Sequence, residues 1–297
     1  MVDFPRLPNG DKPVWDGRNF RMSDRNASVI TYSSNLDGWD DDLTELHEAE
    51  AGDGQHPIDI ASRNNVLQTL KKFGFPSTGC LLEVGCSSGF MLRDLKREFP
   101  KAQIVGSDIL TRALERLAET LPGVPLLQMD LVDCPLAEGQ YDAVVAINVL
   151  EHIENDVTAL QQIARVLKPG GLAIIEVPQG PGLYDYYDHY LRHFRRYDKS
   201  ELVAKIKQSG LKVEKIGFIG FFIFLPFMVV KKLNRLRYGT HGEKSTNIQK
   251  MVRNQIQNTF HSRVLAWALQ ADQVLGNFFG FPIGIRCVTV ARKPRQT

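Results

Sequence analysis

Cysteine is scarce in this chain of 297 residues, and the four cysteines stand far apart, at positions 80, 86, 134 and 287. No C-x-x-C pair is present, so neither a zinc site nor a disulfide framework is expected. Scattered free thiols are typical of a reducing compartment, and we predict a cytoplasmic protein. Residues 1–10 have no basic stretch followed by an apolar one, so we expect no signal peptide.

Long apolar runs and fixed repeats are also lacking. The most apolar stretch, Phe218–Val230, has a proline inside it and ends after 13 residues. A membrane-spanning helix needs about 20 residues, so this stretch is too short to span. Disorder of the whole chain is excluded by a hydrophobic content of 43%.

Charge is distributed unevenly along the chain. Residues 1–60 carry 13 acidic and 5 basic residues, whereas residues 231–297 carry 12 basic and 2 acidic ones. A basic segment of this kind is typical of contact with nucleic acid, anionic lipid or an acidic substrate. A solvated surface that balances the acidic start explains it equally well, and the sequence leaves these readings open.

From about residue 61 the pattern becomes regular. An amphipathic helix over 61–73 precedes short apolar runs that alternate with helical spacing, which predicts parallel strands covered on both faces. The sequence therefore predicts a doubly wound α/β sheet with right-handed crossovers. The predicted strands are 80–85, 103–108, 124–129, 142–148 and 172–177, and the predicted helices are 89–99, 111–121 and 156–167.

The remaining segments suggest three parts. We predict an acidic N-terminal arm over 1–60 with a short helix near 40–51, a core domain over 61–218 and 285–297, and a cap insertion over 219–284. The core then gains a helix at 199–209 and strands at 212–218 and 285–291. The insertion carries apolar clusters at 218–230 and 278–285 and one long helix over about 246–275. If the last two strands are neighbours, both apolar clusters meet and the insertion forms a helical cap over the acceptor end of the sheet.

The strongest chemical signal is the motif Glu83-Val84-Gly85-Cys86-Ser87-Ser88-Gly89 between the first strand and the next helix. Glycines at such a turn let the backbone approach a ligand closely. Asp108 ends the next strand, 19 residues after Gly89, where a carboxylate can accept hydrogen bonds from ribose hydroxyls. Ser87 stands where a dinucleotide fingerprint has its second glycine, which disfavours NAD or FAD.

At this point the sequence resembles the class I S-adenosylmethionine-dependent methyltransferases. The resemblance rests on LLEVGCSSG (81–89), Asp108, Met129-Asp130, YDAVVAINVLEHI (141–153) and LKPGG (167–171), over about residues 80–215. It implies a Rossmann-like, mostly parallel sheet of seven strands whose last strand is antiparallel. It also implies S-adenosylmethionine as cofactor, S-adenosylhomocysteine as product, and no metal.

The resemblance further implies roles for single residues. Glu83 supports the glycine loop, the loop faces the methionine part of the cofactor, and Asp108 holds the ribose. The alternative to a cofactor role is a local turn for Asp130 and a helix cap for Glu83. The implied cofactor-binding set is Glu83, Gly85, Cys86, Ser87, Gly89, Asp108, Ile109, Asp130, Leu131 and Asn148.

The loop after the fifth strand, residues 178–197, is the candidate acceptor site, because substrates bind at the carboxyl ends of such strands. It holds five tyrosines, two histidines and three arginines. A base is needed where the acceptor is a hydroxyl, and histidine titrates near neutral pH. The candidate catalytic residues are His152, His189 and His193, and the candidate acceptor-binding residues are Tyr187, Arg192, Arg195, Arg196 and Tyr197. A purely structural lid is the alternative.

The expected function is methyl transfer to a small-molecule acceptor, with a glycan or a lipid-linked intermediate as the finer hypothesis. The alternatives are a nucleic-acid methyltransferase and a non-catalytic regulatory protein that binds the cofactor. Asn148-Val149-Leu150-Glu151 stands where amino-methyltransferases of bases carry N-P-P-Y, so nucleic acid is disfavoured. Residues 218–237 are the candidate contact with the inner face of a membrane, and burial in a homodimer or against an apolar acceptor are the alternatives.

Overall fold

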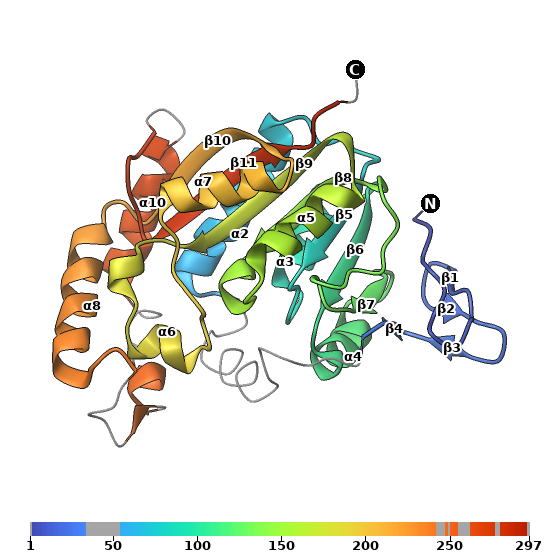
Figure 1. The fold of residues 1–297 in the computed structure, drawn as a ribbon, viewed down its shortest axis with the longest axis horizontal. Helices are drawn as coiled ribbons and strands as arrows, with labels where there is room; N and C mark the ends of the chain where they lie inside the picture. The colour runs from blue at the N-terminus through green and yellow to red at the C-terminus, as the bar shows by residue number, and fades with distance from the viewer. Residues whose placement is uncertain are drawn as a thin grey trace.

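The computed structural model describes residues 2–33, 54–241, 247–248, 250–254, 262–276 and 280–295. At its centre lies a mostly parallel sheet in the order β10-β11-β9-β8-β5-β6-β7-β4, in which β11 runs antiparallel to both neighbours (Figure 1). The strands of this sheet are β4 (Val29–Thr31), β5 (Cys80–Val84), β6 (Gln103–Asp108), β7 (Leu126–Gln128), β8 (Tyr141–Ile147), β9 (Leu167–Pro178), β10 (Lys212–Ile219) and β11 (Arg286–Arg292).

Helices cover both faces of the sheet. One face is packed against α2 (Pro57–Lys72), α3 (Phe90–Glu98) and α4 (Thr111–Thr120), and the other against α5 (Asp156–Val166) and α7 (Lys199–Gln208) (Figure 1). Leu114 and Leu117 of α4 fall on one side of their helix and are buried, as apolar residues three positions apart should be. The doubly wound α/β architecture predicted from the sequence is confirmed.

The strand β9 is longer than the prediction of 172–177. The Pro-Gly-Gly run does follow the end of α5, but the backbone is already extended from Leu167, which pairs with Tyr141. The Gly170 N–H also donates to the Lys293 carbonyl at 2.8 Å. Tertiary pairing, which the local sequence does not reveal, therefore extends the strand through the helix-stop signal.

The sheet has an eighth strand that the expectation of seven did not include. The short strand β4 comes from the N-terminal arm and pairs in parallel with β7, and Ile30 at its centre is buried. Its three residues carry too little pattern to predict a strand. The arm also forms a small antiparallel sheet of β1 (Val14–Trp15), β2 (Phe20–Arg21) and β3 (Asn26–Ala27). The predicted helix over 40–51 lies outside the described residues.

The cap segments gather at one end of the molecule (Figure 1). Rings of Phe221 and Phe281 stack at 4.6 Å between centroids, and β10 and β11 are neighbours, so the two apolar clusters of the insertion meet as expected. The cap is not isolated from the core, because α10 packs against α2 and β10. The cap contains α8 (Phe224–Tyr238) and α10 (Arg263–Gly276), and the short elements that follow β8 and β9 are η1 (Leu150–His152), η2 (Pro181–Leu183) and α6 (Tyr186–Tyr190).

The expectation of one long helix over about 246–275 is wrong. The helix α10 begins at Arg263, and Ser262 before it is not helical. The Ser262 hydroxyl accepts a hydrogen bond from the Leu265 N–H at 3.1 Å, so this serine caps a new helix. Among the described residues, no helix is both long and apolar enough to cross a bilayer.

Candidate active site

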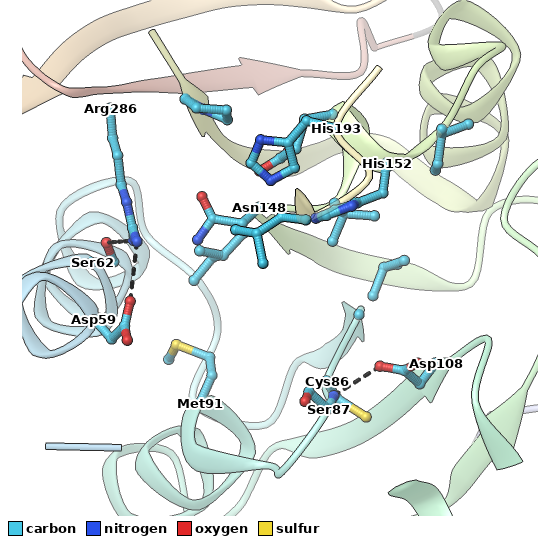
Figure 2. A pocket seen from close by; sticks show the side chains of 18 of the residues that line it. Asp59, Ser62, Cys86, Ser87, Met91, Asp108, Asn148, His152, His193 and Arg286 are labelled. Atoms are coloured by element: carbon cyan, nitrogen blue, oxygen red, sulfur yellow. Dashed lines mark hydrogen bonds and ion pairs between the residues drawn. The ribbon is translucent and has the colours of Figure 1, made fainter. Parts of the chain in front are cut away.

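A cavity of about 720 Å³ opens at the carboxyl ends of the parallel strands (Figure 2). This edge is where ligands bind in open α/β sheets. One side of the cavity is formed by the ends of β5, β6 and β8, and the other by the segment 187–196, α8, Leu265 of α10 and Arg286 of β11. The predicted cofactor and acceptor regions therefore share one cavity.

The glycine loop forms the tight turn that its sequence predicts. Gly85 has a φ of 71°, and a Cβ atom there would lie 2.6 Å from Val149 Cγ2. Ser87 also adopts a left-handed conformation, with a φ of 41°. The loop is fixed to β6, because the N–H groups of Gly85 and Cys86 donate to the Ser107 carbonyl at 2.8 and 3.0 Å.

Asp108 connects this loop to the end of β6. Its Oδ2 accepts a hydrogen bond from the Ser87 N–H at 2.8 Å (Figure 2), and its Oδ1 accepts one from the Leu110 N–H at 3.1 Å. A carboxylate oxygen can accept more than one hydrogen bond, so both oxygens keep capacity for a ligand hydroxyl. Asp108 thus has a structural role beside the predicted ligand-binding one.

Glu83 lies beneath the loop and is fully buried from solvent. Burial, followed by the nearby negative charge of Asp108, raises the pKa of Glu83 well above its ordinary value. Its Oε2 has no hydrogen-bond partner among the described residues. The surroundings of Glu83 therefore favour its neutral form, which fits a support for the loop better than a charged contact.

The strand ends next to Asp108 supply the rest of the predicted cofactor set. Ile109, Asp130, Leu131 and Asn148 all line the cavity. The Asp130 Oδ1 accepts a hydrogen bond from the Val132 N–H at 2.9 Å, which is the local turn considered as the alternative reading. Asn148 has a φ of 52°, which turns the chain out of β8 at the cavity.

Gly89 is the member of the predicted set that does not line the cavity. Its φ is 73°, and a Cβ atom there would overlap the Leu117 side chain of α4. Close packing of α3 against α4 therefore explains this glycine. The motif marked the correct turn, but its last glycine has a structural role.

The acceptor side of the cavity is built around Asp188, which is completely buried. Its carboxylate lies 2.7 Å from Arg196 Nη1, 2.8 Å from Lys231 Nζ and 3.1 Å from His193 Nδ1. Burial opposes ionisation, but Arg196 and Lys231 outweigh it and hold the pKa of Asp188 well below its ordinary value. A stable carboxylate therefore faces the His193 ring.

Burial lowers the pKa of His193, and the hydrogen bond to Asp188 offsets this only in part. The imidazole is therefore neutral near pH 7. Because ionised Asp188 can only accept hydrogen bonds, His193 Nδ1 must carry the hydrogen and Nε2 keeps a lone pair. The His152 ring lies next to it, with the ring centroids 4.7 Å apart. The two imidazoles lie opposite the Ser87–Asp108 pair across the cavity (Figure 2).

Glu151 completes this cluster. One potential ligand atom each from Glu151, His152 and His193 lie within 4.8 Å of one another, so these residues are the candidates for holding a cation. Glu151 is buried, and its Oε2 has no hydrogen-bond partner among the described residues. Burial raises the pKa of Glu151 to about 8. The sequence analysis gave Glu151 no role, because its burial beside His152 and His193 is visible only in the folded structure.

Four predicted residues of the acceptor side do not line the cavity. His189 is exposed, with its ring 4.6 Å from that of His241, and Arg192 is exposed as well. Arg195 pairs with Asp156 at 2.7 Å, and the Tyr197 hydroxyl donates to the same carboxylate at 2.8 Å. Arg195 and Tyr197 therefore fasten the loop to α5, whereas Tyr187 and Arg196 do line the cavity.

Sequence reasoning missed two cations of the cavity wall. Lys231 of α8 pairs with Asp185 at 2.6 Å as well as with Asp188. Arg286 of β11 lies 3.1 Å from Asp59 and 2.9 Å from Glu176. Two features of the sequence could have indicated these positions. Lys231 stands four residues after Phe227, on the same side of a helix, and Arg286 is a charged residue at the start of an apolar strand.

The raised pKa of Glu151 predicts a loss of stability as the pH rises. A carboxyl whose pKa increases from 4.5 to about 8 on folding stabilises the protein fully below pH 4.5, and this stabilisation is lost as the pH approaches 8. We expect the free energy of unfolding to fall between about pH 4.5 and 8, and Glu151→Gln to remove about 4–5 kcal/mol of that fall. Urea unfolding at several pH values measures it. Glu119→Gln, on the exposed surface of α4, is the control, and an equal fall in both variants would contradict the assignment.

Comparisons with known proteins agree with this fold. Residues 82–175 match the family model described as a methyltransferase domain. An uncharacterized methyltransferase of Mycobacterium tuberculosis is 36% identical over 101 residues, which cover 33% of this chain and 50% of that protein. The chain thus spans about half the length of the curated relatives it matches first.

Two solved structures share the fold. Phosphoethanolamine N-methyltransferase 2 of Haemonchus contortus aligns over 85% of this chain and 57% of that one, with a TM-score of 0.54 and 20% identity. The cyclase SpnF aligns over 86% of this chain and 93% of that one, with a TM-score of 0.57 and 18% identity. At these identities the likeness shows the fold alone.

The sheet, the glycine loop and the strand-end aspartate define a Rossmann-like α/β domain with a ligand cavity at its carboxyl edge. Residues 82–175 of this domain match the methyltransferase domain family, and the fold is that of Rossmann-like methyltransferases.

Proposed function

We propose that this protein transfers the methyl group of S-adenosylmethionine to a hydroxyl group of a small-molecule acceptor. The observation that carries the proposal is the Asp188–His193 pair at 3.1 Å, in the same cavity as the glycine loop and Asp108. The cavity thus combines a cofactor side with a positioned base. The solved Haemonchus contortus enzyme was captured with S-adenosylhomocysteine, which supports the choice of cofactor.

The residues on the cofactor side fit S-adenosylmethionine. The turn at Gly85 leaves no room for a side chain, so backbone is exposed to the cavity there. Asp108 would hold the ribose hydroxyls, and Ile109 and Leu131 would contact the adenine. When bound, the cofactor supplies an electrophilic methyl group on a sulfonium.

His193 would act on the acceptor. Its neutral Nε2 would accept the proton of the acceptor hydroxyl as the oxygen bonds to the methyl carbon, and the methyl–sulfur bond would break to leave S-adenosylhomocysteine. Asp188 keeps the ring in the required tautomer and stabilises the imidazolium that forms. Arg196 and Lys231 compensate the buried charge of Asp188, so they position the base without touching the proton that moves.

A binding and transfer experiment tests this function. We expect calorimetry to show binding of S-adenosylmethionine and S-adenosylhomocysteine, and no binding of NAD. Incubation with methyl-labelled cofactor should then label small molecules in glycan or lipid extracts. Label in nucleic acid would favour a nucleic-acid methyltransferase, and binding without any transfer would favour a regulatory protein.

A further inference from the structure

The helix α8 presents two different faces. Ile223 just before it, and Phe227 and Lys231 within it, recur every four residues and line the cavity. The opposite side is apolar yet exposed to solvent. Its exposed fractions are 66% for Leu225, 51% for Val229, 57% for Leu233 and 75% for Leu236. A buried inner face explains why the helix forms, but it does not explain four exposed aliphatic residues in one row.

The helix α10 carries a second exposed apolar row. Val264, Trp267 and Val274 are 79%, 77% and 55% exposed and fall on one side of the helix. Tryptophan is enriched where proteins meet the interface between lipid and water, because its ring is apolar and its N–H is polar. We call the exposed rows of α8 and α10 the outer cap surface, which consists of Phe222, Leu225, Val229, Leu233, Leu236, Val264, Trp267 and Val274.

A buried carboxylate fixes α10 to the start of α8. Asp272 of α10 accepts hydrogen bonds from three successive N–H groups, those of Gly220 at 2.5 Å, Phe221 at 2.7 Å and Phe222 at 3.2 Å. Backbone-to-carboxylate bonds of this kind leave little freedom between the two elements. The two apolar rows therefore stand on elements that are fixed to each other and not on two independent segments.

All exposed charges on these two helices are positive. They are Lys232, Arg235 and Arg237 of α8 and Arg263 of α10. The one acidic residue in the two helices, Asp272, is buried in the contact just described. At 100° per residue, Lys232 and Arg235 lie on one side of the α8 row and Arg237 on the other. An apolar row with a basic border is the pattern of a helix that lies in an anionic lipid interface.

We propose that the outer cap surface docks this protein onto an anionic lipid bilayer. The charges favour lipid over a second copy of the chain, because a two-fold interface would bring the same basic border of each copy together. The row on α8 is also too short to span, so the docking is peripheral.

The position of α8 between this surface and the cavity suggests the acceptor class. Resting on the proposed methyl transfer, we assign the acceptor to hydroxyl-bearing headgroups of lipids in that bilayer. The inner face of α8 reaches the base through Lys231, whose Nζ lies 2.8 Å from Asp188. The same helix therefore touches the bilayer on one side and the catalytic network on the other.

Sedimentation of the full chain with vesicles tests the docking. We expect at least tenfold stronger binding to phosphatidylcholine vesicles containing phosphatidylglycerol, at about one third of the lipid, than to pure phosphatidylcholine, and weaker binding at high salt. Replacing Lys232, Arg235 and Arg237 together by glutamine should weaken anionic binding roughly 100-fold. Leu233→Asp should weaken it at least tenfold.

Matched controls separate docking from folding. Val14→Asp makes the same kind of change at a residue 54% exposed on the N-terminal arm, and Lys101→Gln removes an exposed charge away from the cap. Both controls should bind vesicles like the wild type, and all variants should bind S-adenosylhomocysteine like the wild type. Equal vesicle binding by Leu233→Asp and Val14→Asp would overturn the proposal. So would a dimer that Leu233→Asp converts to monomers without any vesicle binding by the wild type.

The two proposals fail in different ways. Labelled methyl transfer to the lipids of anionic vesicles should decline with the docking variants, in parallel with vesicle binding. Vesicle binding without cofactor binding would overturn the methyl transfer and leave the docking intact. Transfer to a water-soluble acceptor at equal rates in all variants would overturn the lipid acceptor.

Discussion

His193→Ala is expected to lower turnover by roughly 10²- to 10⁴-fold, the usual contribution of a positioned base. The variant loses the Nε2 that would accept the hydroxyl proton, whereas Asp188, Arg196 and Lys231 keep their mutual ion pairs. Cofactor affinity should stay within a few-fold of the wild type, because His193 lies across the cavity from Asp108 (Figure 2). Steady-state kinetics on a labelled acceptor and calorimetry with S-adenosylhomocysteine measure both quantities.

His189→Ala is the matched control, because it removes the same side chain from an exposed site outside the cavity. The pH profile supplies a second check. The base must be neutral, and its pKa lies below the ordinary value of 6.5, so the wild-type rate should be level near pH 7 and fall only in more acidic solution. Undiminished turnover in His193→Ala would remove the proposed base.

Asp108→Ala is expected to weaken cofactor binding by roughly 30- to 1000-fold, because it removes a charge-assisted pair of hydrogen bonds. The structure adds a second cause, since the Ser87 and Leu110 N–H groups lose their acceptor and the glycine loop is no longer held. Calorimetry with S-adenosylmethionine measures the loss, and thermal unfolding shows whether the variant is folded.

Two comparisons separate these causes. Asp133→Ala removes an exposed carboxylate that does not line the cavity, so it should leave cofactor affinity unchanged. Asp108→Asn keeps one acceptor oxygen for the loop but removes the charge, so it should fall between the wild type and Asp108→Ala. Wild-type affinity in a folded Asp108→Ala protein would end the cofactor assignment.

The fold could be predicted wherever one local pattern was decisive. The strand at 103–108 has its predicted bounds, because a short buried run stands between a polar residue at its start and Asp108 at its end. The strand β4 could not be predicted, since three residues acquire a strand conformation only by pairing with β7. The break before α10 was missed because an apolar helical period continues through Ser262, and one hydroxyl cap decides the boundary.

In the candidate site, too, the sequence indicated residues that belong to one local motif and not those positioned by distant partners. Residues within one motif, such as Gly85 and Asp108, were found because their spacing along the chain carries the signal. Lys231 and Arg286 were not, because their partners lie 43 and 110 residues away in sequence. Within the loop 178–197, residue type alone did not distinguish His193, which lines the cavity, from exposed His189.

The Asp185–Asp188–Lys231 cluster constrains how this protein can evolve. Its carboxylates and the Lys231 ammonium are almost fully buried, so a change that removes Lys231 alone leaves Asp185 without its cation and Asp188 with Arg196 only, at a cost of about 3–5 kcal/mol. Replacing the three together by apolar residues avoids that cost, provided that Arg196, the other partner of Asp188, is replaced as well. Substitutions at positions 185, 188 and 231 should therefore be correlated across descendants of this chain. A lineage that loses the lysine should lose the acidic pair as well, and with it the orientation of His193.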